Sequence, residues 1–409
     1  MRIIFAGTYI PLLSERMLSS PVFEQLPPLS LYIHIPWCVS KCPYCDFNSH
    51  EAGEGDIAET AYIDALVRDL EFELPRIWGR RIISVFIGGG TPSLLSAMGV
   101  KRLASVLNSY LNLSPGIEIT LEANPGTAEA GRFSAYREAG INRLSIGIQS
   151  FDDEKLEALG RIHSAVEARR AIDMAQKAGF NNINIDLMYG LPGQSAAAAQ
   201  DDLETATACG ATHISRYQLT LEPNTVFYKT PPHLPAEDEC WTIQMEGDLL
   251  LRERGYAQYE ISAYAKDGRC CTHNLNYWEF GDYLGIGAGA HGKLTDPETG
   301  SITRYSRHRL PFQYMRRAGG GNVIVREQKL TQEDLVLEFM MNTMRLTDGI
   351  PVRLFRERTG LPLSEAGYGL QAAEQRGLIA RDTHKLGATE LGRRYLNDLL
   401  QLFMVENDG

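Results

Sequence analysis

The sequence predicts an α/β protein: a partial (β/α)6 barrel followed by a C-terminal, mainly helical, winged-helix-like appendage. Short runs rich in β-branched residues recur along the 409-residue chain, separated by stretches long enough for a helix. This alternation is typical of a parallel sheet, because parallel neighbours need crossover connections. Chemically unusual residues come at or just after the ends of five successive runs. In a barrel these ends meet at one mouth, whereas an open doubly wound sheet would spread them along an edge, so the barrel is favoured.

Six segments carry the strand pattern. They are residues 31–35, 82–89, 117–124, 143–150, 182–190 and 213–220. The clearest helix is expected over 164–178, where Ser164 and Glu167 form a capping-box pattern and Gly179 can end the helix.

The chain divides into three predicted parts. Residues 1–27 form an N-terminal extension, 28–330 the barrel with its closing segments, and 331–409 the C-terminal appendage. The stretch 221–330 shows no clean period and is expected to hold closing segments and loops. Thr331 and Asp334 are candidate caps of the first helix of the appendage.

Composition indicates a soluble globular protein of the cytoplasm. Hydrophobic residues make up 44% and charged residues 22%, and the net charge of −11 gives no general attraction for nucleic acid or an anionic membrane. No apolar run is long enough for a membrane span. The first apolar run is broken by Gly7 and Pro11 and lacks a clear cleavage site, which argues against a signal peptide. Translation could start at Met1 or at Met17.

Three of the seven cysteines, Cys38, Cys42 and Cys45, lie within eight residues just after the first predicted strand. Buried cysteines clustered by chance are one explanation. Structural zinc needs four ligands, for which His34 or His50 would have to complete the set, although neither has a common zinc-finger spacing. An iron–sulfur cluster with three cysteine ligands, which leaves one iron open for an exogenous ligand, is the favoured interpretation.

The spacing C-x3-C-x2-C after the first strand of a barrel resembles the radical S-adenosylmethionine (SAM) superfamily. Nine motifs in order make the chain similar to its oxygen-independent coproporphyrinogen III oxidase-like group. They are YIHIPWC, CDFNS, GGGTPS, EANPG, RLSIGIQSF, LGRIHS, NIDLMYGLPGQ, HNLNYW and GIGAGAH. The resemblance runs from about residue 28 to 400 and implies a [4Fe–4S] cluster on Cys38, Cys42 and Cys45, whose open iron is chelated by SAM.

The resemblance also implies a set of residues around SAM. They are Tyr32, Tyr44, Gly89, Gly90, Thr91, Glu122, Gln149, Arg161 and Asp186. Bare glycines let a backbone approach a ligand closely, and the planar fork of arginine suits a carboxylate. Ordinary packing of the two tyrosines, a tight turn at the glycines, and an ion pair between Arg161 and Asp186 are the structural alternatives.

One departure from the group bears on function. Its oxidising members carry a fourth cysteine two residues after the third, where this chain has Phe47. Decarboxylation of coproporphyrinogen is therefore not expected, and the resemblance favours a branch of haem chaperones. Such a protein would bind haem as cargo and deliver it to haem-accepting proteins such as respiratory enzymes. Haem or iron donors would be its other partners. Oxygen-independent coproporphyrinogen III dehydrogenase is the alternative function. The sequence does not fix the oligomeric state, for which a homodimer is one option.

The motif HNLNYW is the candidate haem site. His273 offers the imidazole that haem iron commonly takes as an axial ligand, and Tyr277 and Trp278 offer flat apolar area. A structural turn with packed aromatics is the alternative. Cys270 and Cys271 are the other candidate ligands.

Overall fold

Six parallel strands form the frame of the protein, in a computed structural model that describes residues 23–53, 57–126 and 131–404. They pair in chain order, each with the next. Their bounds are β1 (Leu29–Ile35), β4 (Arg81–Gly89), β5 (Asn112–Ala123), β6 (Arg143–Gln149), β7 (Ile183–Tyr189) and β8 (His213–Gln218). The predicted partial barrel of six strand–helix units is confirmed. The alternative starts Met1 and Met17, and most of the expected N-terminal extension, lie outside the described residues.

Further strands extend the sheet at both edges to twelve strands. At the β1 edge these are β11 (Asp282–Ile286), which is parallel to β1, and then antiparallel β12 (His291–Thr295), β13 (Ile302–Arg307) and β14 (Ile324–Lys329). At the β8 edge they are the antiparallel strands β10 (Ala263–Ala265) and β9 (Ala257–Glu260). The stretch without a clear period therefore supplies the closing strands.

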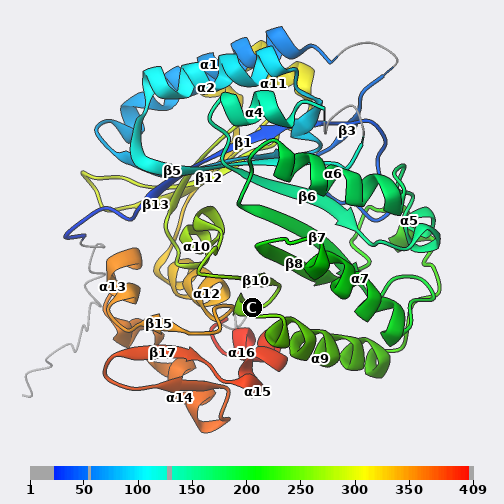
Figure 1. Ribbon diagram of the computed structural model, residues 1–409. Coiled ribbons are helices and arrows are strands. Elements are labelled where there is room, and N and C mark those ends of the chain that lie inside the picture. The colour runs from blue at the N-terminus through cyan, green and yellow to red at the C-terminus, as the bar shows by residue number, and fades with distance from the viewer. Residues whose placement is uncertain (1–22, 54–56, 127–130, 405–409) are drawn as a thin grey trace, which may run out of the picture.

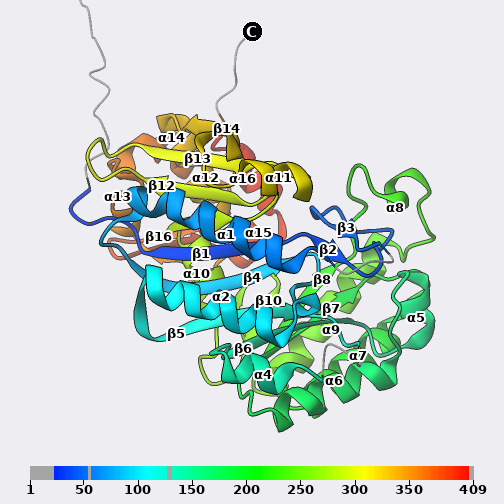
Figure 2. The same cartoon turned by 90° about the horizontal axis from the view of Figure 1, so that it is seen from above.

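Helices cover the outer face of the curved sheet (Figures 1 and 2). They include α1 (Glu59–Glu73), α2 (Ala97–Tyr110), α4 (Phe133–Glu138), α5 (Asp153–Ala158), α6 (Ala165–Lys177) and α7 (Ala196–Ala208). The predicted capping box of α6 is confirmed, with Ser164 and Glu167 bonded reciprocally. A short helix, α10 (Thr272–Trp278), lies on the inner side of the curve (Figure 1). A long helix, α9 (Glu237–Glu253), follows the barrel strands, and smaller elements are β2 (Trp37–Cys38), β3 (His50–Glu51), α8 (Val226–Lys229) and α11 (Pro311–Arg317).

The two faces of the sheet differ in polarity. In β6, Leu144, Ile146 and Ile148 are fully buried in the main hydrophobic core. Because side chains alternate along a strand, Ser145 and Gln149 point to the opposite, inner face. The inner face of the barrel therefore carries polar groups that can meet a ligand.

The C-terminal part packs around a second hydrophobic core. Its helices are α12 (Gln332–Thr343), α13 (Leu354–Thr359), α14 (Gly367–Gln375), α15 (Glu390–Arg394) and α16 (Leu396–Gln401). Its small antiparallel sheet has the order β15 (Ile350–Pro351), β17 (Lys385–Ala388), β16 (Ile379–Arg381). The predicted cap pair of Thr331 and Asp334 is confirmed, whereas the domain boundaries stay predictions. Within the described residues, no helix combines the length and the apolar character needed to cross a membrane.

Candidate functional site

The three clustered cysteines lie on one loop that follows β1. The loop is closed at its base where β2 pairs with β3, and the Ala52 amide donates to the Cys38 carbonyl at 2.8 Å. Inside it, the Cys45 amide donates to the Cys42 carbonyl at 3.1 Å. The backbone thus holds the three thiols at the C-terminal end of β1, at the mouth of the barrel.

The thiols lie close enough to influence one another. Burial raises the pKa of Cys38 and of Cys45, and the neighbouring Cys42 thiol raises both pKa values further. Thr91 donates from Oγ1 to Sγ of Cys38 at 3.4 Å, and this bond opposes the rise. If all three thiols ionised, their negative charges would repel one another. A metal cluster binds cysteines as thiolates and supplies the compensating positive charge, so the three thiols suit such a cluster.

The histidines considered as extra zinc ligands are engaged elsewhere. In His34, Nδ1 lies 3.0 Å from the Tyr32 hydroxyl and Nε2 lies 2.9 Å from the Asn48 carbonyl oxygen. His50 Nε2 lies 3.2 Å from the Arg309 carbonyl oxygen. Among the described residues, no three His, Cys, Asp or Glu side chains form a single-ion site. An iron–sulfur cluster has no need of one, because its cysteines ligate different irons.

The turn after β4 brings bare backbone to the mouth of the barrel. Gly89 has a φ of +119°, and a Cβ there would lie 2.6 Å from the His34 ring. A Cβ on Gly90 would lie 2.5 Å from the Trp37 carbonyl oxygen. Both positions therefore require glycine. The Gly89 amide donates to Glu122 Oε2 at 3.0 Å, so the predicted turn also fixes an acidic side chain.

Two carboxyl groups lie on the inner face of the barrel. Burial, together with the charge of Asp186, raises the pKa of Glu122 to about 8. Burial also raises the pKa of Asp186, which accepts hydrogen bonds from Ser145 at 3.0 Å and Asn184 at 2.7 Å. A cationic or hydroxylated ligand would favour the ionised form of both groups.

Arg161 connects the cluster loop to the strand ends. Its Nη2 donates to Asn124 Oδ1 at 2.8 Å and to the Gly147 carbonyl at 2.9 Å, and Nη1 donates to Sγ of Cys42 at 3.5 Å. Its buried Nε has no partner among the described residues. The alternative of an ion pair with Asp186 is wrong, since each of the two side chains has other partners. The orphaned Nε leaves a donor for an anionic ligand group.

Gln149 ends β6 in a conformation unusual for a residue other than glycine, with a φ of +69°. Its Oε1 accepts a hydrogen bond from the Tyr217 hydroxyl at 3.0 Å. Backbone strain of this kind costs on the order of 1–3 kcal/mol and is concentrated at functional sites. The position thus fits a ligand-contacting role.

The two predicted aromatic contacts occupy different surroundings. Tyr32 lies on the inner face of β1, where its ring packs 6.3 Å from Phe86 and 6.4 Å from His273, measured between ring centroids. Tyr44 lies on the cluster loop, and its ring is 6.4 Å from Phe227 in α8. Only Tyr44 is thus placed on the cluster loop itself.

Two site residues escaped the sequence analysis. Asn124 bridges Arg161 to Thr91, whose Oγ1 accepts from Asn124 Nδ2 at 2.9 Å. The Tyr217 hydroxyl donates a hydrogen bond to the side chain of Gln149. Strand alternation could have found Asn124, because it follows Glu122 by two positions. Tyr217 likewise follows by two positions Ser215, whose hydroxyl donates to Asn184 beside Asp186 on the inner face at 3.1 Å.

His273 lies in α10, inside the barrel, and is 9% exposed. Its Nδ1 is 3.2 Å from Ser84 Oγ, and its ring is 5.1 Å from the Phe86 ring. Burial lowers its pKa to about 3, so the imidazole is neutral near pH 7.

The neighbouring cysteines differ from each other. Cys271 is buried, with Sγ 3.6 Å from Glu118 Oε1, and burial raises its pKa to about 12. Cys270 is partly exposed, and burial raises its pKa as well. Burial thus disfavours the thiolate form of both residues.

Comparisons with known proteins agree with this geometry. The family model of the radical SAM superfamily matches residues 32–206, and the model of the HemN C-terminal domain matches residues 330–395. A solved structure of coproporphyrinogen III oxidase (HemN) from Escherichia coli superposes with a TM-score of 0.78 at 23% identity, over 92% of this chain and 90% of that one. The fold and the cysteine loop define a radical SAM protein.

Full-length relatives narrow the class. The chain is 50% identical to heme chaperone HemW of Haemophilus influenzae over 386 residues, covering 93% of this chain and 99% of the relative. It is 48% identical to heme chaperone HemW of Escherichia coli, covering 93% of this chain and all of the relative. The chain belongs to the HemW family.

Proposed function

We propose that this protein is a cytoplasmic haem chaperone that holds a [4Fe–4S] cluster with SAM, binds haem and delivers it to acceptor haem proteins. The observation that carries the proposal is the match of nearly the whole chain to relatives named heme chaperone HemW. The cluster loop and the polar mouth of the barrel support it from the chemistry of the site. Haem-accepting respiratory enzymes, haem or iron donors, and a second copy of the chain are the partners proposed.

The site residues fit the two cofactors. Cys38, Cys42 and Cys45 would ligate the cluster. The turn at Gly89, Gly90 and Thr91, together with the carboxyl, amide and guanidinium groups at the strand ends, would hold SAM. The bound cofactors would supply one-electron chemistry, and the protein would orient SAM and exclude competing reactions. The orphaned Nε of Arg161 and the ligand-favoured ionisation of Glu122 support this assignment.

His273 remains the proposed axial ligand of haem iron. Its neutral imidazole is the form that binds iron, and its Nδ1 contact with Ser84 would fix the ring orientation. The buried, protonated thiol of Cys271 makes that residue the weaker candidate.

The oxidase alternative has its support in the fold shared with HemN. Against it stands Phe47, which is 61% exposed on the cluster loop and cannot act as a thiol. Anaerobic incubation of the reconstituted protein with SAM, a reductant and coproporphyrinogen separates the two functions. We expect no catalytic formation of protoporphyrinogen; turnover would establish the oxidase instead.

Haem transfer tests the chaperone function directly. The holoprotein, loaded with haem and freed of excess, is mixed with the haem-free form of a respiratory haem protein. We expect the acceptor to regain its haem spectrum faster than haem dissociates into a competing scavenger. If the acceptor gains haem no faster than the scavenger does, the protein does not deliver haem directly and the chaperone function is rejected.

A further inference from the structure

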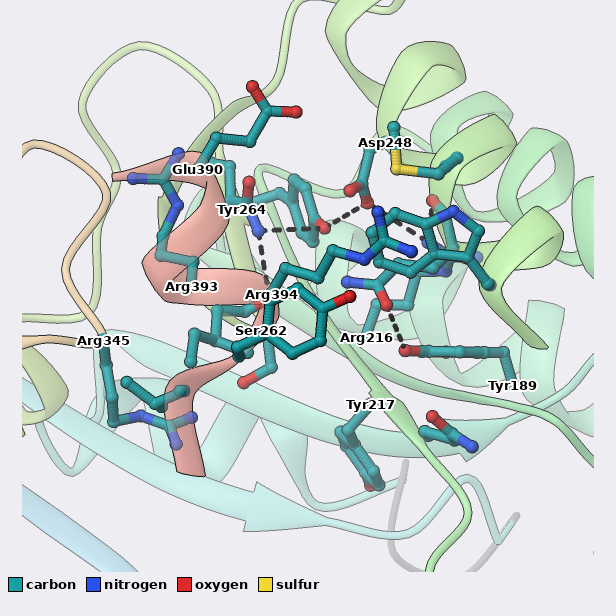
Figure 3. Close-up of a pocket in the computed structure, with 18 of the residues that line it drawn as sticks. Tyr189, Arg216, Tyr217, Asp248, Ser262, Tyr264, Arg345, Glu390, Arg393 and Arg394 are labelled. Carbon is teal, nitrogen blue, oxygen red and sulfur yellow. Dashed lines mark hydrogen bonds and ion pairs between the residues drawn. The ribbon is translucent and has the colours of Figure 1, made fainter. Parts of the chain in front are cut away.

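A cavity of about 1060 Å³ lies between the β8 edge of the barrel and the C-terminal helices. Its walls come from α9, from the ends of β7 and β8, and from α15 and α16. Figure 3 looks into it, with Arg394 reaching across from the C-terminal side toward Asp248. The volume is at the upper end of the roughly 300–1,000 Å³ of small-molecule pockets, which suits a large ligand.

One wall is an apolar stripe on α9. Trp241, Met245 and Leu249 follow one another at intervals of four residues, so they share one helix face. They are 37%, 43% and 54% exposed, respectively, and all three line the cavity. Tyr217 and Tyr395 add aromatic rings that are 37% and 44% exposed. Flat apolar area of this kind is available to the face of a planar ligand.

Three arginines also line the cavity. Arg252 comes from α9, and Arg393 and Arg394 come from α15. Within the part of the chain that the structure describes, none of the three forms a close ion pair with a carboxylate. Burial raises the pKa of Asp248, however, and the charge of Arg252 lowers that pKa in opposition, while Arg393 donates from Nη1 to the Ala388 carbonyl at 3.0 Å. Arg394 is held over the Trp241 ring at 4.2 Å and near the Tyr395 ring at 5.5 Å. Its guanidinium is therefore positioned by stacking and still has donors for a carboxylate.

Several other charged side chains of the cavity already have partners. Arg216 donates to the carbonyls of Ile243 and Gln244 and contacts Asp248. Asp248 accepts from the Tyr264 hydroxyl at 2.5 Å, and Glu246 accepts from Gln200 at 3.2 Å. Glu390 of α15 and Asp398 of α16 also line the cavity, on the same side as Arg393 and Arg394.

The cavity lies beside the candidate SAM site. Tyr217 lines the cavity and donates to Gln149, a residue expected to contact SAM. On the other side, Arg345 lines the cavity and stacks at 4.4 Å on Trp278 of the HNLNYW segment. His273 itself does not line the cavity.

We infer that this cavity binds a planar aromatic macrocycle bearing carboxylates, with the macrocycle on the α9 stripe and Tyr217 and the carboxylates on Arg252, Arg393 and Arg394. The inference rests on the proposed function, because haem is a macrocycle of this class. It adds a docking site that recognises the ring and its carboxylates without needing the iron. Binding of the metal-free ring therefore does not depend on His273.

Three ligands test the inference on the full-length holoprotein. Haem, iron-free protoporphyrin and protoporphyrin dimethyl ester share the ring but differ in iron and in carboxylate charge. The two iron-free ligands cannot bind through His273 and therefore report on the cavity alone. Arg394→Gln should weaken binding of iron-free protoporphyrin about tenfold and leave the diester nearly unchanged, because only the dicarboxylate loses a charge-assisted bond. Leu249→Glu should weaken binding of both. Arg326→Gln, at an exposed position on β14, is the matched control and should change none.

Other outcomes are equally informative. Equal loss of diester and dicarboxylate binding in Arg394→Gln would overturn carboxylate recognition, and wild-type affinity in both Arg394→Gln and Leu249→Glu would overturn the docking site. In either case haem binding by the wild-type protein leaves the proposed chaperone function standing. Wild-type protein that binds no haem would reject the proposed function itself. Iron and sulfide content equal to wild type in every variant verifies that the fold and the cluster are intact.

Discussion

The guanidinium of Arg161 lies 3.5 Å from the thiol of Cys42, measured from Nη1 to Sγ. The same side chain reaches the ends of β5 and β6 through Asn124 and the Gly147 carbonyl. Arg161 thus joins the loop that would carry the cluster to the strand ends that would carry SAM, and a change there should affect one cofactor more than the other.

Arg161→Lys should lower the affinity for SAM about tenfold while the iron and sulfide content stays near that of wild type. Lysine keeps the charge but lacks the planar fork and the Nε donor, and a hydrogen bond to a charged group is worth about 1.5–3 kcal/mol. Equilibrium dialysis with SAM and chemical analysis of iron and sulfide measure the two quantities. Loss of the cluster together with SAM binding would instead assign Arg161 to holding the loop.

Replacing Cys38, Cys42 or Cys45 by Ala should abolish [4Fe–4S] assembly, because each change removes one of three protein ligands. Cys240→Ala is the matched control, since that thiol is buried in α9. Anaerobic reconstitution followed by iron and sulfide analysis reads the result. Wild-type content in all three loop variants would rule out this cluster site.

The stability of the ligand-free protein should fall as the pH rises toward about 8. The Glu122 carboxyl has a pKa of about 8 in the folded protein and about 4.3 in an unfolded chain. Between these values the folded state holds a proton that the unfolded state has released, so the free energy of unfolding decreases with rising pH.

Glu122→Gln cannot titrate and should flatten this dependence, while its amide oxygen can still accept from the Gly89 amide. Urea unfolding at about pH 6 and about pH 8.5 compares the two proteins. The same decrease in both would show that other groups, such as Asp186, dominate the pH response.

His273→Ala should weaken haem binding and shift the Soret band while leaving iron–sulfur content intact. The imidazole would be lost as a ligand, whereas the cysteine loop lies on another segment. Titrations with haem and with iron-free protoporphyrin separate the contributions, since only haem should respond. An unchanged Soret band and haem affinity would remove His273 as the ligand and turn attention to Cys270 or Cys271.

Arg307→Met should cost about 3–5 kcal/mol of unfolding free energy. Arg307 donates to Asp69 at 2.6 Å and to Glu73 at 2.8 Å, and all three side chains are fully buried. Among the described residues, removing the cation leaves Asp69 with only the neutral donors Tyr314 and the Gly287 amide, while Glu73 keeps Arg76 at 3.3 Å. The exposed pair Arg353–Glu357 is the control, and Arg353→Met should cost no more than about 1 kcal/mol. A small effect at Arg307 would mean that solvent reaches the carboxyl groups in the variant.

Local patterns predicted much of the fold. The strands follow from short runs rich in β-branched residues, and the caps at Ser164 and Thr331 follow from capping chemistry; both act over a few residues. β11 was not predicted because its sequence, DYLGI, contains a single β-branched residue. It therefore lacks the local composition that marked the other parallel strands.

The partners within the site could not be read from the sequence. Opposite charges suggested an ion pair between Arg161 and Asp186. Instead, the Asn124 side chain and the Gly147 carbonyl, both neutral, accept the hydrogen bonds of the guanidinium. Which groups meet at the mouth depends on the register of β5, β6 and β7, and that register is set by tertiary packing. The residue types could therefore be predicted, but their pairing could not.

The glycine turn after β4 has a consequence for mutagenesis. A side chain at Gly90 would collide with the backbone of Trp37, which leads directly into Cys38. Alanine at this position would push the cysteine loop away and lose the cluster without removing any chemical group. In an alanine scan read by cluster content, Gly90 would therefore look the same as a cysteine that ligates the cluster. Only a readout that separates misplacement from missing chemistry, such as rescue by a compensating change in the loop, can assign a role to this turn.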